Sequence, residues 1–301
     1  MISAESVKAG LKNQAHGRGH ILQEELTAYG LERTVYRISI SDYMDKFTLK
    51  GGILLYALFD GDFTRATTDL DLLAQMTSNE AENIKTIFEE IFSIEVDDAL
   101  RYELKTLVVH PIAEFKEYPG VNVSIMAFLD KTRIPVSIDI GFGDIVYPRR
   151  VLMDFPVLLD MDTPKVYTYS LASVVAEKFE AIVSLGYANS RYKDFYDIYM
   201  LLNKCNFDGS ELRNAINETF VHRKTGYDDI VAFEDEFTED TVRKNRWNAF
   251  IKKKKAMISV EFVTAVDSIK TFLEPVVKAI VNEEDFDKEW VADERQWSEK
   301  R

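Results

Sequence analysis

The spacing of apolar residues changes along the chain. Apolar and polar positions alternate over residues 121–128 and 134–140, a period of two that predicts β-strands, and residues 47–49 and 104–109 add two shorter strands. From about residue 169 the period lengthens to three or four and stays helical to the end of the chain. The pattern therefore predicts a strand-rich first half and a helical second half.

The helices that we expect lie in both halves of the chain. Ser170 is suited to begin one of them, because a serine oxygen accepts a hydrogen bond from the first helical turn. The predicted helices cover residues 6–44 with a break near 17–19, then 53–59, 79–92, 171–185, 191–202, 209–218, 238–256, 258–282 and 284–298.

Prolines at positions 148, 156 and 164 indicate a connecting stretch between the two halves. We therefore predict two domains, residues 1–165 and residues 166–301. The first has a mixed β-sheet flanked by helices and the second is α-helical, so the expected fold class is α+β.

Composition restricts the class of protein. With 301 residues, 46% of them hydrophobic, the chain can form two packed units. The net charge of -14 argues against a protein that coats nucleic acid, so a nucleic-acid partner would need a local basic patch. The single cysteine, Cys205, allows no internal disulfide. The start of the chain lacks the features of a signal peptide, and no apolar stretch approaches the roughly 20 residues that span a bilayer. We expect a cytoplasmic protein without a membrane partner.

The first candidate site is the run Thr68-Asp69-Leu70-Asp71-Leu72. In a strand, alternate side chains share a face, so Asp69 and Asp71 point to one side and the leucines to the other. Two close carboxylates repel each other unless a cation lies between them, and Mg²⁺ prefers such oxygen ligands. The alternative is a solvated strand edge, which is common in acidic chains.

A glycine turn precedes this run. Lys50-Gly51-Gly52 joins the strand 47–49 to the apolar segment 53–59. Glycine lets the backbone approach a phosphate closely, and the free amides of a helix start can face it. A plain tight turn explains the glycines equally well.

Asp139 is a candidate third carboxylate. It alternates with Val136, Ile138 and Ile140 and therefore leaves the apolar face of its strand. A solvated strand face is the alternative interpretation.

Lys178 lies in the middle of the apolar stripe of the helix 171–185. A lysine there extends to solvent, faces a cleft or pairs with an anion. On the next helix, the periodicity places Asp194 beside the apolar stripe with Arg191 on the same side, and it directs Asp197 the opposite way. Asp194 could also simply favour the helix N-terminus.

A basic stretch stands out in this acidic chain and lies beside Trp247 and Phe250. It could hold a phosphate backbone and offer a ring for stacking, or it could form a solvated face. Its seven basic residues are Arg243, Lys244, Arg246, Lys252, Lys253, Lys254 and Lys255.

Taken together, the order of these motifs resembles the polymerase-beta type of nucleotidyltransferase fold, and more closely the AbiEii/AbiGii family of type IV toxins from bacterial phage defence. The resemblance covers most of the chain and is loose over the last 100 residues. One departure is Gly52, since the superfamily usually has serine after the first glycine. The segments that carry the resemblance are residues 29–33, 36–39, 47–52, 68–72, 138–140, 176–179 and 191–197.

The resemblance implies roles for these residues. Asp69 and Asp71 would bind Mg²⁺, with Asp139 either completing the acidic set or acting as the base. Lys178 would hold the nucleotide phosphates, and Asp194 would orient Lys178 or act as the base in place of Asp139. The nucleotide-binding set would comprise Lys50, Gly51, Gly52, Arg65, Thr68 and Lys178.

The implied activity is transfer of a nucleoside monophosphate from a nucleoside triphosphate, GTP or a pyrimidine nucleotide, to the 3′ end of tRNA, which would block translation. A cognate antitoxin is implied by the family alone. Two alternatives remain open, which are transfer to a small molecule or protein, and nucleotide sensing without turnover.

Overall fold

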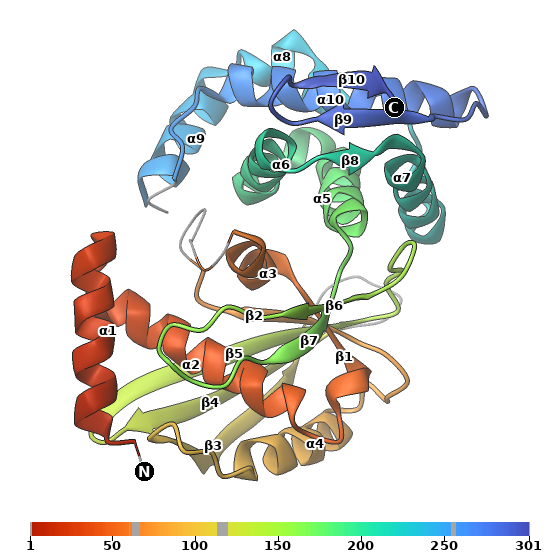
Figure 1. Cartoon of the computed structure of the whole chain (residues 1–301). Coiled ribbons are helices and arrows are strands. Elements are labelled where there is room, and N and C mark those ends of the chain that lie inside the picture. The colour runs from red at the N-terminus through yellow and green to blue at the C-terminus, as the bar shows by residue number, and fades with distance from the viewer. Residues whose placement is uncertain (1, 60, 62–66, 113–119, 254–256, 301) are drawn as a thin grey trace. The chain divides into compact units, whose positions relative to one another are not determined.

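Figure 1 shows the computed structural model of the chain, which describes residues 2–59, 61, 67–112, 120–253 and 257–300. The chain divides into two compact units. The first unit comprises residues 1–143 and 151–168, and the second comprises residues 144–150 and 169–301. None of the described helices combines the length and apolar character that a membrane span requires.

The first unit is built on a seven-stranded sheet with the strand order β3-β4-β5-β2-β1-β7-β6. Strand β2 runs parallel to β5, and β1 runs parallel to β7, whereas the other neighbours are antiparallel, so the sheet is mixed as predicted. The strands are β1 (Phe47–Lys50), β2 (Leu70–Ala74), β3 (Leu100–Pro111), β4 (Val121–Leu129), β5 (Thr132–Phe142), β6 (Val151–Asp154) and β7 (Lys165–Thr168).

The proline-rich stretch before residue 168 was predicted as a connection, and this was incomplete. Strands β6 and β7 pair antiparallel within it and extend the sheet beyond β1. Each is only four residues long, too short for its alternation to be distinguished from a loop by sequence alone.

The α-helices in the described part of the first unit are α1 (Ala4–Arg18), α2 (Leu22–Ser39), α3 (Gly51–Leu58) and α4 (Ala81–Ser93). Helix α2 packs closely on β5, since a Cβ added at Gly30 would lie 2.7 Å from the Ile134 side chain. Ile134, Val136, Ile138 and Ile140 are all buried. The α2 side of β5 is therefore apolar core, and the alternate residues of that strand are left on the opposite face.

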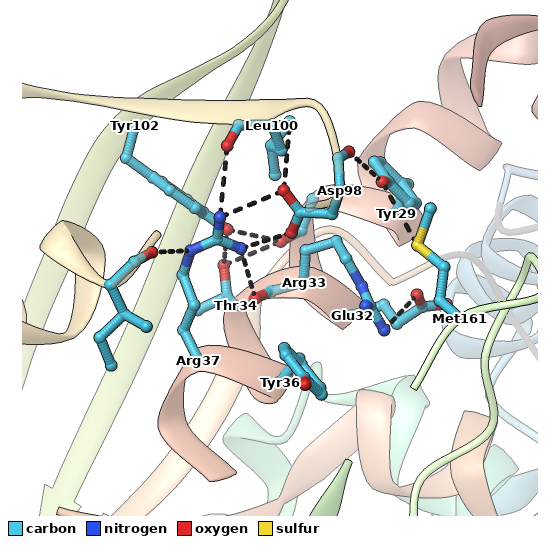
Figure 2. Close-up of polar contacts among 12 residues, drawn as sticks. Tyr29, Glu32, Arg33, Thr34, Tyr36, Arg37, Asp98, Leu100, Tyr102 and Met161 are labelled. Carbon is cyan, nitrogen blue, oxygen red and sulfur yellow. Dashed lines mark hydrogen bonds and ion pairs between the residues drawn. The ribbon is translucent and has the colours of Figure 1, made fainter. Parts of the chain in front are cut away.

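A buried polar network joins α2 to the start of β3 (Figure 2). Arg37 donates to both carboxylate oxygens of Asp98, at 2.6 and 3.2 Å, and Asp98 also accepts from the amide of Leu100 at 3.0 Å. Tyr29 donates to the carbonyl of Asp98 at 2.5 Å, and the hydroxyls of Thr34 and Tyr102 lie 2.8 Å apart. These contacts explain structurally why Arg37 is tolerated inside α2, because its buried charge is paired with Asp98.

The second unit contains α5 (Leu171–Leu185), α6 (Tyr192–Lys204), α7 (Gly209–Arg223), α8 (Asp235–Thr238), α9 (Thr241–Lys253) and α10 (Phe262–Val281). Ser170 caps α5 as predicted, accepting a hydrogen bond from the amide of Ser173 at 3.0 Å. Arg223 at the end of α7 pairs with Asp144, Glu177 and Glu180, which ties residues 144–150 to α5.

The helix predicted over residues 284–298 was wrong. This segment forms the antiparallel hairpin of β9 (Lys288–Val291) and β10 (Gln296–Glu299), and β9 also pairs with β8 (Phe207–Asp208). Trp290 and Trp297 lie opposite each other in the hairpin, and Phe272 of α10 contacts both rings. Aromatic packing against α10 thus overrides the helical preference of the Glu- and Lys-rich segment.

Candidate active site

Four polar residues lie in register across neighbouring strands of the first unit, and we call this set the polar row. Lys50 of β1 pairs with Asp71 of β2, Asp71 with Asp139 of β5, and Asp139 with Asn122 of β4. Partners in register place their side chains on the same face of a sheet, about 5 Å apart. The polar row therefore crosses the face opposite α2.

Asp69 completes an acidic cluster beside the polar row. It precedes β2 and is half-buried, like Asp71, whereas Leu70 between them is buried. The backbone and side chain of Thr68 both donate to its Oδ1, at 3.3 and 2.9 Å. The alternation predicted from the sequence is thus present in the structure.

The acidic cluster fits a divalent cation. One carboxylate oxygen from each of Asp69, Asp71 and Asp139 lies within 4.8 Å of the others. Oxygens on opposite sides of an octahedral Mg²⁺ are about 4.2 Å apart, so a small adjustment of side chains is enough to bind one. Three carboxylates so close together repel each other, and a cation relieves that repulsion.

The glycine turn lies in close contact with this cluster. Gly51 has φ of +70°, a conformation that glycine adopts readily. It also opens α3, so the turn presents the first amides of a helix directly beside Asp71. Backbone donors at a helix start are suited to phosphate oxygens, which supports the phosphate interpretation of this turn.

Lys178 in the second unit is paired with two acids. Its ammonium lies 2.7 Å from Asp197 Oδ2 and 3.3 Å from Asp194 Oδ1, and the lysine side chain is 11% exposed. Arg191 donates to the other oxygen of Asp194 at 2.6 Å. Of the alternatives for Lys178, the structure shows pairing with anions.

The prediction that Asp197 points away from this site was wrong. Asp194 and Asp197 are both almost completely buried and both contact Lys178. The helical wheel assumed that α6 has one solvent face, but nearly every residue from 192 to 202 is buried, so the wheel had no solvent side to assign to Asp197.

Some residues of the basic stretch contact other parts of the second unit, and others are exposed. Arg243 of α9 donates to the carbonyls of Asn189 and Tyr187 and lies over the ring of Phe237, and Lys244 pairs with Glu239. Arg246, Lys252 and Lys253 are exposed.

Trp247 was one of two rings beside the basic stretch that could have been available for stacking, and the structure excludes it. The indole is fully buried, donates to the carbonyl of Val260 at 2.7 Å and packs against Tyr192 and Phe262. It is part of the core of the second unit. Arg65, Lys254 and Lys255, which the sequence also nominated, lie outside the described residues.

Asn122 contacts the acidic cluster and was not indicated by the sequence pattern. Its amide donates to Asp139 at 2.6 Å and to Ser137 at 2.9 Å. The only local signal was a residue of low strand propensity inside an alternating strand.

A mixed sheet with one acid just before β2, one on β2, one on the neighbouring β5 and a glycine turn beside them is typical of a nucleotidyltransferase. The chain belongs to the family described as AbiEii nucleotidyl transferase toxin, type IV toxin–antitoxin system, whose family model matches residues 33–274. A comparison with curated protein sequences finds no match.

Two solved structures share the fold. MenT4, a nucleotidyltransferase toxin from Mycobacterium tuberculosis, aligns with a TM-score of 0.54 at 15% identity, over 91% of this chain and 98% of its own. A Helicobacter pylori protein described as a candidate nucleotidyltransferase aligns with a TM-score of 0.50 at 12% identity, over 85% of this chain and 96% of its own.

Proposed function

We propose that this nucleotidyltransferase toxin transfers a nucleoside monophosphate, in a Mg²⁺-dependent reaction, from a nucleoside triphosphate to the 3′ end of tRNA. The observation that supports this best is the pairing of Asp71 with Asp139 across parallel strands, with an oxygen of Asp69 within 4.8 Å of both. The donor would be GTP or a pyrimidine nucleotide.

Asp69, Asp71 and Asp139 would hold Mg²⁺, and the ion would supply charge neutralisation at the phosphates and polarisation of the phosphorus that is attacked. Thr68 restrains the carboxylate of Asp69 through two hydrogen bonds, which limits the reorganisation needed for binding. An acceptor hydroxyl would then displace pyrophosphate from the α-phosphorus.

Backbone amides at the start of α3, next to Gly51 and Gly52, would bind phosphate oxygens. Lys50 and Lys178 would supply positive charge to the nucleotide, and Asp194 would hold the Lys178 ammonium in place. With glycine at position 52 there is no side-chain hydroxyl to assist, so these contacts come from the backbone.

The proposed RNA-binding surface is the exposed part of the basic stretch, Arg246, Lys252 and Lys253. Replacing any of these three with alanine should reduce the salt dependence of RNA binding, because fewer phosphates are then neutralised. Arg243 and Lys244 already have protein partners, so we expect them to contribute less.

Altered tRNA ends would stop translation, which suits a toxin of a phage-defence system that acts in the cytoplasm. The type IV toxin–antitoxin family implies a cognate antitoxin that counteracts the enzyme.

The test is incubation of the purified protein with labelled nucleoside triphosphates and separate pools of tRNA, protein and small-molecule acceptors. We expect label in tRNA with Mg²⁺, none after chelation, and none with Asp71→Asn. Asp267→Asn on the exposed face of α10 is the matched control and should retain activity. Label only in the protein or small-molecule pool would replace the tRNA proposal, and nucleotide binding without transfer to any pool would favour the sensing alternative.

A further inference from the structure

Asn122 is the one member of the polar row with neither charge nor an assigned function. It lies within β4, where it pairs with Asp139 on one side and with His110 of β3 on the other. Asparagine is disfavoured in strands, and its immediate neighbours Val121 and Val123 are typical strand residues. A disfavoured residue in the middle of a sheet is expected where a site needs its side chain.

The side-chain amide of Asn122 donates two hydrogen bonds. One goes to Asp139 Oδ1 at 2.6 Å and the other to Ser137 Oγ at 2.9 Å. The reversed amide would place its oxygen against the Asp139 carboxylate, and two acceptors repel, so the network fixes the orientation of the amide. Ser137 and Asp139 lie two residues apart on β5, so both acceptors come from the same face of one strand.

The hydrogen bond to Asp139 restrains the rotation of that carboxylate. Of the described carboxylates in the acidic cluster, Asp69 is held by Thr68 and Asp139 by Asn122, whereas Asp71 is confined by the close approach of Gly51. A carboxylate that is already oriented loses less freedom when it binds a cation.

We propose that Asn122, itself held by Ser137, is a positioning residue that presents Asp139 as a metal ligand. This inference rests on the proposed function, because it requires the acidic cluster to bind a divalent cation. It extends the active site to a fourth strand, β4, and assigns Asp139 to metal binding.

The inference is tested by Mn²⁺ binding to the full-length protein, measured by electron paramagnetic resonance without nucleotide, beside thermal melting of each variant. Asn122→Val removes the donor and suits a strand, and Ser124→Val is its control, because Ser124 lies two residues further along the same face of β4. We expect Asn122→Val to weaken Mn²⁺ binding by about tenfold or more and Ser124→Val to leave it unchanged.

Ser137→Ala provides a second, milder variant that leaves Asn122 and Asp139 in place. It should weaken Mn²⁺ binding by roughly two- to threefold, because the amide of Asn122 loses its other acceptor. If Asn122→Val does not fold, this variant decides the question. At saturating Mg²⁺, both variants should recover most of the transfer rate, which separates loss of metal affinity from general damage.

Asp71→Asn separates the inference from the proposed function. If Asp71→Asn loses Mn²⁺ and Asn122→Val binds it as the wild type does, Asn122 has no positioning role and the metal site stands. If Asp71→Asn binds Mn²⁺ as tightly as the wild type, the acidic cluster is no metal site, and the inference is overturned with it.

Discussion

Gly51 and Asp71 are in such close contact that no other residue can replace the glycine without moving the carboxylate. A Cβ at position 51 would lie 1.8 Å from Asp71 Oδ2 and 2.4 Å from its Cγ. The φ of +70° at Gly51 adds a second constraint. The glycine turn and the acidic strand are thus mutually dependent parts of one site.

We therefore expect Gly51→Ala to reduce nucleotidyl transfer by roughly 100-fold, because displacement of a positioned group by about 1 Å has effects of that size. The measurement is the transfer rate at saturating nucleotide, with circular dichroism to confirm the fold. Gly17→Ala is the control, since a Cβ there meets nothing within 4 Å and the residue lies in α1. A Gly51→Ala enzyme with unchanged activity would contradict the close fit of Gly51 against the Asp71 carboxylate.

Asp197 and Asp194 offer a second prediction. The ammonium of Lys178 lies closer to Asp197, at 2.7 Å, than to Asp194, at 3.3 Å, and both acids are buried. Asp197→Asn should therefore lower nucleotidyl transfer at least as much as Asp194→Asn, by roughly tenfold or more, the effect expected when one charge-assisted hydrogen bond is removed. Separate measurements of kcat and of KM for the nucleotide show which step is affected. Unchanged kinetics for Asp197→Asn would show that its contact with Lys178 does not affect the transfer.

The ion pair of Arg37 and Asp98 gives a prediction on stability. Both side chains are at most 2% exposed, so Asp98→Ala leaves an unpaired charge inside the first unit. The free energy of unfolding should fall by about 3–5 kcal/mol, as measured by urea denaturation. Arg101→Ala is the comparison, because Arg101 is 63% exposed and its pair with Glu103 should contribute less than about 1 kcal/mol. Equal losses for the two variants would show that burial of the pair does not determine its importance.

The buried carboxyl of Glu32 should make the free energy of unfolding depend on pH. Burial raises the pKa of its carboxyl from 4.5 to about 7, although Arg33 and the amide of Leu158 partly oppose this. Between those two values the folded state keeps a proton that the unfolded state releases, so the free energy of unfolding falls as the pH rises. Each unit of pKa difference corresponds to about 1.4 kcal/mol.

The measurement compares urea unfolding of the wild type and Glu32→Gln at pH 5 and pH 8. Relative to the variant, the wild type should become less stable as the pH rises, because glutamine stays neutral throughout. Glu82→Gln, at an exposed position in α4, should show no such difference. A wild type and Glu32→Gln that respond equally to pH would contradict a raised pKa for Glu32.

Local patterns in the sequence were sufficient to predict most of the elements. Alternation placed β4 and β5 and separated Asp139 from the apolar face of β5, because the side-chain direction in a strand follows from position alone. The Ser170 cap likewise depends only on neighbouring residues. The strands β6 and β7 were missed because each has only four residues, and the hairpin of β9 and β10 was missed because the packing of its tryptophans against α10 overrides a helical preference.

The sequence by itself indicated the candidate residues of the proposed site, namely Asp69, Asp71, Asp139 and Lys178, because a charged residue that interrupts an apolar pattern can be recognised without a fold. Only the tertiary structure decided which residues contact Asp139 and Lys178. The register of β4 against β5 brings Asn122 to Asp139, and the packing of α6 against α5 brings Asp197 to Lys178. Both depend on how one element pairs or packs with the next, and the period within a single element does not encode that.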